Sequence, residues 1–228
     1  MVFVDPLIIF STFFFGLISL LASPFDRSGG FMIKTARVWA RSLLAIAGVK
    51  VNVQGIEKLK PGTAYVFASN HLSYMDTPVI LTHIQANFRF MAKRGLFQIP
   101  LLGTHLGQAG HIPVPREDPR AAIKTMTLAA ETIRSKNISI LIFPEGGRSD
   151  DGELHPFKDG AAYIAIKAQV PLVPVAISGT REILAMHSAT FHRGKVSLTI
   201  GDPICTTGLD RKSLTEKARQ SIVALLSR

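Results

Sequence analysis

Cysteine is almost absent from the chain, because Cys205 is the only one among 228 residues. A single cysteine excludes an internal disulfide and any CxxC metal or redox site. It also fits a reducing compartment that faces the cytosol. Cys205 stands without a local nucleophile signature, so we interpret it as chemically inert.

Acidic residues are also few: 16 Asp and Glu stand against 26 Lys and Arg, giving a formal net charge of +10. Such a charge favours polyanionic partners, which include nucleic acid, anionic membranes and phosphorylated substrates. Zinc-finger, RNP and basic-helix signatures are missing and the positive charge is scattered, so we predict no nucleic-acid partner. A nucleic-acid binder stays an alternative that rests on charge alone.

The first long segment lacks charge altogether, from Leu7 to Ser23, and Pro24 closes it. As a helix it would be about 26 Å long, slightly shorter than a hydrocarbon core of ~30 Å. A signal peptide is one alternative, but no basic region precedes the segment and no clear A-x-A site follows. An apolar helix buried in a soluble core is the other alternative.

A second segment, Phe31 to Ala47, mixes apolar residues with Lys34, Arg37 and Arg41. Together with Trp39, this composition suits an interfacial helix whose basic and aromatic residues lie near lipid headgroups. A turn-rich connector joins the two segments, so we predict a helical hairpin that dips into one leaflet or just spans the membrane.

Two regions are therefore predicted: a membrane-associated helical hairpin at residues 1–48 and an α/β domain at residues 49–228. The predicted location is the cytoplasmic face of a membrane, with an anionic membrane surface as a partner. Expected strands are 51–53, 64–68, 88–92, 111–114, 138–143, 172–177 and 196–200, and expected helices are 77–85, 99–106, 119–135, 160–168 and 213–227. This alternation predicts a mainly parallel sheet with helices on both faces.

The stretch NHLSYMD follows one of these strands and places His71 and Asp76 five residues apart. Positions i and i+5 lie about 140° apart on a straight helix, so the pair has to straddle a bend. Pro78 fits the first turn of a helix, which predicts a helix start between Ser73 and Thr77. Asp76 could then orient His71 as a general base. The alternative is a surface histidine beside an Asp that caps a helix.

The stretch FPEGGRS follows another expected strand and contains Glu145, Gly146, Gly147 and Arg148. Two glycines let backbone N–H groups approach a ligand closely, and a guanidinium offers a planar fork that matches a phosphate. This predicts a phosphate-binding loop, with a plain Glu–Arg ion pair as the alternative.

Lys93 and Arg94 also follow a strand, which places them at the same edge of a parallel sheet as His71 and Glu145. They are candidate binding residues, although surface lysines are common in any protein. Arg116 is a weaker candidate of the same kind.

Four blocks in order, NHLSYMD, KRGLFQIPLLG, FPEGGRS and VPLVPVAI, resemble the glycerophospholipid acyltransferase family, in particular its 1-acylglycerol-3-phosphate acyltransferases. The resemblance covers roughly residues 60–180. It implies acyl transfer from acyl-CoA or acyl carrier protein to a lysophospholipid, without a metal or another cofactor. By position, His71 and Asp76 resemble the catalytic pair, and Glu145, Gly146, Gly147, Arg148 and Lys93 the substrate-binding residues.

Two residues depart from the family pattern: Gly147 stands where threonine is usual and Gly95 where an acidic residue is frequent. The acceptor's identity therefore stays open, with glycerol 3-phosphate or another lysolipid as alternatives. His71 would take the acceptor's hydroxyl proton as the oxygen attacks the thioester. Covalent catalysis by Ser73 is an alternative, but a thiolate leaves readily and direct transfer suffices. A lipid-binding protein without turnover is the alternative from another class.

Overall fold

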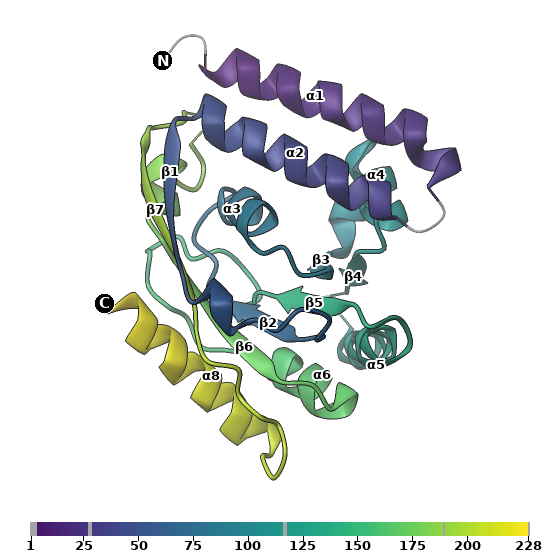
Figure 1. Ribbon diagram of the computed structural model, residues 1–228, viewed down its shortest axis with the longest axis vertical. Helices are drawn as coiled ribbons and strands as arrows, with labels where there is room; N and C mark the ends of the chain where they lie inside the picture. The colour runs from purple at the N-terminus through teal and green to yellow at the C-terminus, as the bar shows by residue number, and fades with distance from the viewer. Residues whose placement is uncertain (1–3, 27–28, 116–117, 189, 228) are drawn as a thin grey trace.

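The structure is a computed structural model that describes residues 4–26, 29–115, 118–188 and 190–227. A sheet runs through its centre in the order β1-β7-β6-β2-β5-β3-β4 (Figure 1). Its strands are β1 (Val49–Gln54), β2 (Val66–Ser69), β3 (Phe88–Lys93), β4 (Ile112–Val114), β5 (Ser139–Ile142), β6 (Leu172–Ser178) and β7 (Gly194–Ile200). Each falls within or beside a strand expected from the sequence.

The strand pairs are parallel except for β6 and β7, which run antiparallel with Val175 opposite Ile200. The expected mainly parallel sheet is therefore confirmed. The central strand β2 is buried along its whole length, as a strand covered on both faces has to be. The carboxyl ends of β2, β5 and β3 meet at one edge, where residues following these strands can share a site.

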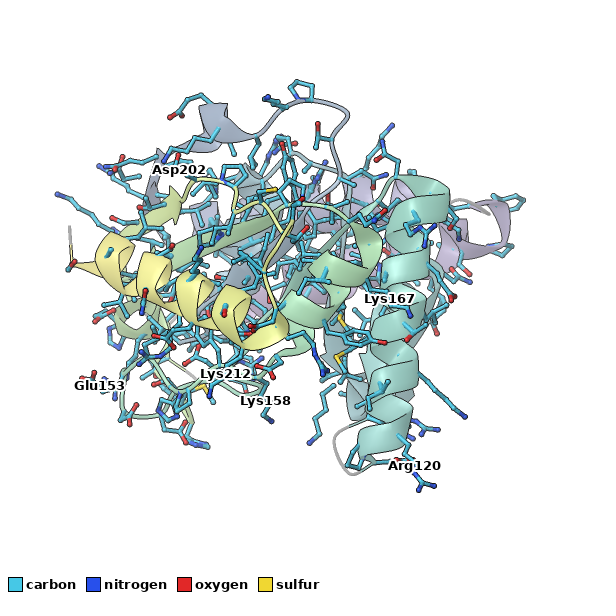
Figure 2. The ribbon with its side chains drawn as sticks, turned by 90° about the horizontal axis from the view of Figure 1, so that it is seen from below. Arg120, Glu153, Lys158, Lys167, Asp202 and Lys212 are labelled. Carbon is cyan, nitrogen blue, oxygen red and sulfur yellow. The ribbon has the colours of Figure 1, made fainter. Side chains whose placement is uncertain are left out.

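Helices cover both faces of the sheet, as expected (Figure 1). One face carries α2 (Gly30–Ile46) and α3 (Asp76–His83), and the other carries α5 (Pro119–Lys136), α6 (Gly160–Ala168) and α8 (Arg211–Leu226). Figure 2 shows the second face, where the exposed Arg120, Lys167 and Lys212 lie on the outer side of these helices.

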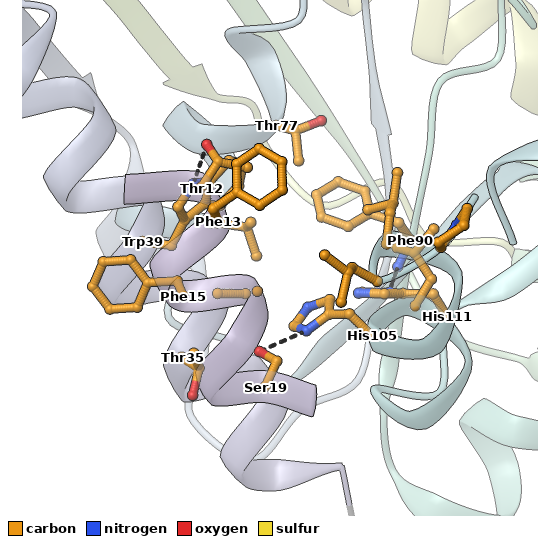
Figure 3. A pocket seen from close by; sticks show the side chains of 17 residues that line it. Thr12, Phe13, Phe15, Ser19, Thr35, Trp39, Thr77, Phe90, His105 and His111 are labelled. Atoms are coloured by element: carbon orange, nitrogen blue, oxygen red, sulfur yellow. Dashed lines mark hydrogen bonds between the residues drawn. The ribbon is translucent and has the colours of Figure 1, made fainter. Parts of the chain in front are cut away.

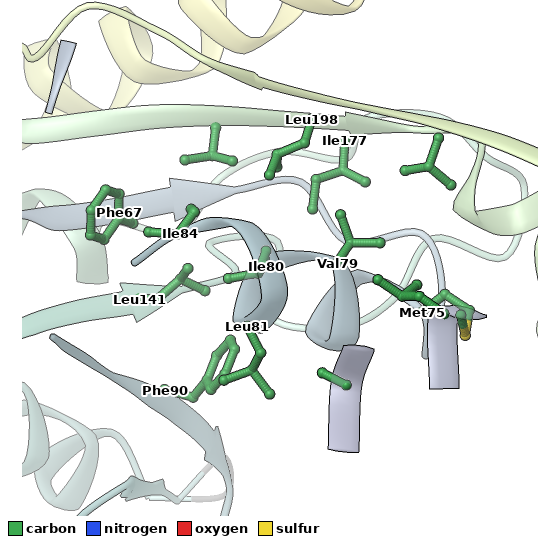
Figure 4. Packing of buried hydrophobic residues seen from close by; sticks show 14 of the residues in the cluster. Phe67, Met75, Val79, Ile80, Leu81, Ile84, Phe90, Leu141, Ile177 and Leu198 are labelled. Carbon is green, nitrogen blue, oxygen red and sulfur yellow. The ribbon is translucent and has the colours of Figure 1, made fainter. Parts of the chain in front are cut away.

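The two faces bury separate apolar clusters. On the α3 side, Ile80 and Ile84 pack against Phe67 and Leu141 of the sheet (Figure 4). On the other side, the cluster consists mainly of alanine and isoleucine, including Ile140, Ile164 and Ala165, and also contains Val66. Successive residues of one strand, such as Val66 and Phe67, enter opposite clusters, because neighbouring side chains of a strand point to opposite faces.

The outermost helix, α1 (Val4–Ala22), packs along α2, so the two N-terminal helices form the expected pair (Figure 1). Residues Pro6–Phe25 form a helix long and apolar enough to cross a membrane, with a mean hydropathy of 2.0. Only 17% of that apolar window is buried. Phe10 is 68% exposed and Leu21 66%, so α1 is not the buried core helix that the sequence left as an alternative.

Helix α2 differs from the expected interfacial helix, because one of its basic residues turns inward. The Arg37 Nη2 donates hydrogen bonds to the carbonyl oxygens of Ile84 at 3.1 Å and Ala86 at 2.7 Å. Ile84 caps the end of α3 and Ala86 lies in the loop that follows, so the guanidinium is held at the end of α3 rather than near headgroups. Because α2 also buries Ala40 and Leu44 in the α3-side cluster, the boundary at residue 48 stays a prediction.

Two further segments differ from the expectation. The helix expected at residues 99–106 is α4 (Leu102–Gln108), which follows the 3-10 helix η3 (Arg94–Gln98). Between them, Leu101 has φ 65° and ψ −56°, and the Leu102 amide bonds the Pro100 carbonyl at 2.8 Å. This is the positive-φ γ-turn, which is rare and strained for a residue with a side chain. The short helix α7 (Thr180–Ile183) was not expected.

Candidate active site

His71 and Asp76 are in direct contact. His71 lies in the loop after β2, and Asp76 is the first residue of α3, so the pair straddles the bend that the spacing required. The His71 Nδ1 and the Asp76 Oδ2 are 2.7 Å apart, and both residues are buried. A carboxylate on Nδ1 fixes the tautomer in which Nδ1 carries the proton and Nε2 can accept one.

Three other donors hold the Asp76 carboxylate. Oδ2 accepts hydrogen bonds from the backbone amides of Leu72 at 2.7 Å and Ser73 at 3.0 Å. Oδ1 accepts one from the Thr180 Oγ1 at 2.6 Å. Thr180 is fully buried at the start of α7, and sequence reasoning missed it. The signal that could have found it is its place directly after β6, at the same sheet edge as His71.

An aromatic platform supports the imidazole. The rings of His71 and Phe143 are stacked with centroids 3.8 Å apart and planes 12° apart. The Phe90 ring lies nearly parallel to that of Phe143, with centroids 6.3 Å and planes 13° apart. Phe143 opens the FPEGGRS stretch, so the loop after β5 provides the surface against which the His71 ring, in the loop after β2, rests.

Glu145 connects the same two loops through their backbones. Its Oε1 accepts a hydrogen bond from the His71 amide at 2.7 Å, and its Oε2 accepts one from the His155 amide at 2.9 Å. The Ser149 amide in turn donates to the His71 carbonyl at 2.9 Å. Burial raises the pKa of Glu145, and the two amide donors partly oppose that rise. The Glu145 carboxylate thus holds in place the loop at residues 70–75, named the base loop for the predicted role of His71.

The two glycines of the loop have different structural roles. Gly146 has φ +80°, and a Cβ there would come within 2.8 Å of the Lys158 Nζ, so the position favours glycine. At Gly147, no described atom lies within 4 Å of such a Cβ. The Cβ of the threonine usual at this position in the family would therefore meet no obstacle.

Arg148 is half-buried and lies against the base loop. Its Cζ lies 3.8 Å from the centre of the Tyr74 ring, in cation–π geometry. Arg148 and His71 therefore lie in loops that contact each other at several points.

Lys93 ends β3 and is exposed, at the same sheet edge as His71. Strand β5 lies between β2 and β3, which separates the two strand ends by about 10 Å at ~4.8 Å a strand. Arg94 begins η3 and is also exposed. Arg116 lies outside the described residues.

An apolar cavity of about 530 Å³ adjoins this edge (Figure 3). Figure 3 shows Phe13 and Ser19 of α1 facing Phe90, His105 and His111 across it. Thr77, the neighbour of Asp76, also lines it, so the cavity reaches the start of α3. The His105 Nδ1 lies 3.1 Å from the Ser19 Oγ, which connects α4 to α1 at the cavity wall.

The arrangement can perform general base chemistry on a hydroxyl group. It offers an oriented imidazole, a guanidinium in a neighbouring loop and an apolar space beside them. Among the residues that the structure describes, no group of three or more His, Cys, Asp or Glu side chains could hold a metal ion.

Comparison with known proteins gives consistent matches. Residues 50–178 match the family described as Acyltransferase. The chain is 36% identical to the chloroplastic 1-acyl-sn-glycerol-3-phosphate acyltransferase BAT2 of Brassica napus, over 82% of this chain and 54% of that protein. It is 29% identical to the 1-acyl-sn-glycerol-3-phosphate acyltransferase alpha of Homo sapiens, over 91% of this chain and 76% of that protein.

One solved structure covers the whole chain. It is the 1-acyl-sn-glycerophosphate acyltransferase PlsC from Thermotoga maritima, with a TM-score of 0.81 and 26% identity over 100% of this chain and 96% of that one. The chain spans about half the length of the plant relatives, 54% of the Brassica protein and 56% of the chloroplastic LPAT1 of Arabidopsis thaliana, to which it is 35% identical over 89% of its length.

Proposed function

The chain belongs to the acyltransferase family, and from this premise we propose that it acylates the free hydroxyl of 1-acylglycerol 3-phosphate. The donor is acyl-CoA or acyl carrier protein, and the product is phosphatidic acid. The observation that carries the proposal is the contact between two loops, one with the His71–Asp76 pair and the other with Arg148. A hydroxyl and a phosphate of one small acceptor can reach both loops at once.

His71 acts as the general base in this reaction. Its Nε2 takes the proton of the acceptor hydroxyl as the oxygen attacks the thioester carbonyl, forming a C–O bond. The C–S bond then breaks, and the proton passes from His71 to the departing thiolate. Asp76 keeps the imidazole in the required tautomer and stabilises its protonated form.

The loop after β5 binds the acceptor's phosphate. Arg148 supplies a charged, planar donor set that matches phosphate oxygens, and Gly146 and Gly147 let the ligand approach the backbone. Glu145 shapes this loop through its hydrogen bonds to the His71 and His155 amides. Lys93 adds a positive charge at the same sheet edge.

The apolar cavity accommodates a fatty acyl chain. Its walls are mainly aromatic and aliphatic, and it begins beside Thr77, one residue from Asp76. An acyl chain bound there would present its carboxyl end to the base loop. Each methylene buried contributes about 0.8 kcal/mol, so the cavity supplies affinity for the chain rather than for the headgroup.

Helix α1 attaches the protein to the cytoplasmic face of a membrane with an anionic surface. The support is its exposed apolar side, including Phe10, Leu17 and Leu21, together with the net charge of +10. Replacing these three residues by serine should move the protein from the membrane fraction to the soluble fraction. Retention at the membrane would show that another surface does the anchoring.

The central experiment supplies acyl-CoA or acyl carrier protein with 1-acylglycerol 3-phosphate and measures thiol release and phosphatidic acid. Parallel reactions use a monoacylglycerol, which lacks the phosphate. Arg148→Ala should lose roughly 10- to 150-fold with the phosphate-bearing acceptor, as expected for a charge-assisted hydrogen bond of about 1.5–3 kcal/mol.

The same variant should change the reaction of the monoacylglycerol much less. Arg148→Lys should restore part of the activity, because a point charge lacks the fork geometry. Equal losses on both acceptors, with an unchanged acceptor KM, would remove Arg148 from the acceptor site.

A further inference from the structure

Tyr74 is a large aromatic residue in the base loop that does not enter the core. Its neighbours Ser73 and Met75 are buried, whereas Tyr74 is 51% exposed. The Ser73 Oγ donates a hydrogen bond to the Leu184 carbonyl at 2.7 Å and accepts one from the Met75 amide at 3.1 Å, which fixes this turn. The turn therefore directs the Tyr74 ring outward, where core packing gives no reason for its size.

The ring lies against a guanidinium instead. The Arg148 Cζ lies 3.8 Å from the centre of the Tyr74 ring, well inside the ~6 Å within which a cation is attracted to a ring face. A guanidinium that lies over a ring directs its N–H groups along its own plane. Bidentate recognition of a phosphate requires that direction.

The turn that carries Tyr74 is itself held by the catalytic pair. The Ser73 amide donates to the Asp76 Oδ2 at 3.0 Å, and the same oxygen lies 2.7 Å from the His71 Nδ1. The ring is thus placed by the structure that places the base. A phosphate gripped by Arg148 would be held at a set position relative to His71.

We propose that Tyr74 is a positioning residue that holds the plane of the Arg148 guanidinium for the acceptor's phosphate. This inference rests on the proposed function and deepens it, since it assigns acceptor recognition to a residue of the base loop. Tyr74 acts through Arg148, and it takes no part in proton transfer.

The first test compares Tyr74→Leu with Tyr74→Phe. Leucine removes the ring, whereas phenylalanine keeps it and removes only the hydroxyl. Tyr74→Leu should raise the KM for 1-acylglycerol 3-phosphate roughly 2- to 10-fold, the range of a half-exposed cation–π contact, with kcat changed less than about twofold. Tyr74→Phe should stay close to the wild type. Circular dichroism and thermal unfolding would check that both variants fold.

A double-mutant cycle then tests whether the effect passes through the guanidinium. In an Arg148→Ala background, Tyr74→Leu should add nothing to the acceptor KM. The matched control is Phe143→Leu, which removes the ring stacked on His71 and should lower kcat instead. Multiplicative losses in the Tyr74 and Arg148 cycle, or an equal KM rise with a monoacylglycerol, would overturn the proposal.

A binding measurement separates this inference from the proposed function. Glycerol 3-phosphate is titrated by calorimetry into the wild type, Tyr74→Leu and Tyr74→Phe, without a donor. Weaker binding in Tyr74→Leu alone supports the inference even if the wild type shows no acyl transfer, an outcome that would refute only the proposed function. If all three proteins bind glycerol 3-phosphate with the same affinity, or if none of them binds it, the inference is overturned.

Discussion

The pair of loops after β2 and β5 differs from the apolar cavity in how it is built. The loops meet through two directed hydrogen bonds, from the His71 amide to the Glu145 Oε1 at 2.7 Å and from the Ser149 amide to the His71 carbonyl at 2.9 Å, and each loop is a short continuous stretch. The walls of the cavity are mainly apolar side chains, although Trp39 donates a hydrogen bond to Thr12 and His105 contacts Ser19, at 3.1 Å each. It is enclosed by side chains from α1, α2, α3, β3 and α4, which lie far apart in the chain.

This difference separates two kinds of specificity. Hydrogen bonds of defined direction place reacting groups, and the loss of one donor leaves a buried partner unsatisfied. Apolar walls select by volume, and their contributions change gradually with each methylene. Substitutions in the loops should therefore reduce the rate for every chain length, whereas substitutions in the cavity should change which chain length is preferred.

The largest effect is expected from substitutions in the hydrogen-bonded loops. His71→Ala should lower the rate roughly 10²- to 10⁴-fold, the range for removing a general base. Asp76→Asn should cost little more once His71 is gone, because the carboxylate acts through the imidazole. Steady-state kinetics on the two single variants and the double variant measure this. Multiplicative losses would show that the residues act separately.

A smaller effect is expected one contact further from the base. Thr180→Val removes the hydroxyl that donates to the Asp76 Oδ1 at nearly constant volume. A hydrogen bond to a charged group contributes about 1.5–3 kcal/mol, so kcat should fall by roughly tenfold or more while the acceptor KM changes little. Thr180→Ser, which keeps the hydroxyl, is the control. Equal activity of the valine and serine variants would contradict the role.

Gly16→Leu tests whether the cavity selects the length of the acyl chain. Gly16 lines the cavity, and no described atom lies within 4 Å of a Cβ built there, so the new side chain would occupy space left for the ligand. Each excluded methylene should cost about fourfold, from ~0.8 kcal/mol. A series of acyl-CoA chain lengths should show the longest chains losing most and short ones unchanged.

The control for that variant is Gly107→Leu in α4. A Cβ at Gly107 would also meet no described atom within 4 Å, but Gly107 does not line the cavity. The Gly107→Leu variant should therefore prefer the same acyl chain lengths as the wild type. A uniform loss across all chain lengths in Gly16→Leu would assign the position to folding or membrane attachment rather than to chain selection.

The smallest expected effect concerns stability rather than activity: the free energy of unfolding should depend on pH through His111. Burial, with smaller contributions from His105 and Arg89, lowers the pKa of His111 to about 3. Between pH 6.5 and 3 the unfolded chain therefore binds a proton at His111 and the folded chain does not, so the free energy of unfolding falls as the pH falls. The loss approaches about 1.4 kcal/mol per pH unit in that window.

Denaturant unfolding at pH 7 and pH 5 would measure this loss. His111→Asn should show a smaller decrease between the two pH values than the wild type. An unchanged decrease would mean that His111 is already protonated in the folded protein at pH 5.

Much of the fold could be predicted from the sequence, because the signals are local. Apolar runs mark each strand, and the proline at position 78 correctly indicated a helix start close to Asp76. The strand order and the antiparallel pairing of β6 with β7 could not be predicted, since they depend on which strands meet in space. The inward turn of Arg37 depends likewise on where α3 ends.

The candidate site divides in the same way. The contact of His71 with Asp76 follows from their spacing, and the structure shows it. Thr180 is 104 residues from its partner Asp76, and the signal that could have found it was its place just after β6, at the sheet edge of His71. The Phe143 platform required knowing that β5 lies next to β2. The catalytic roles of His71 and Asp76 and the binding roles of Glu145, Gly146, Gly147, Arg148 and Lys93 stay predictions.

The strand order also determines when the protein can assemble during its synthesis. Within the described sheet, β1 pairs with β7, and β2 pairs with β5 and β6, so the first two strands to leave the ribosome wait for strands made much later. A nascent chain that ends before Ser139 contains His71 and Asp76 but no partner strand for β2. At roughly 5–20 residues per second, several seconds separate the translation of β2 from that of β5. Under the membrane attachment proposed for α1, this helix, which precedes β2 in the chain, would hold the unfinished chain at the membrane during that interval.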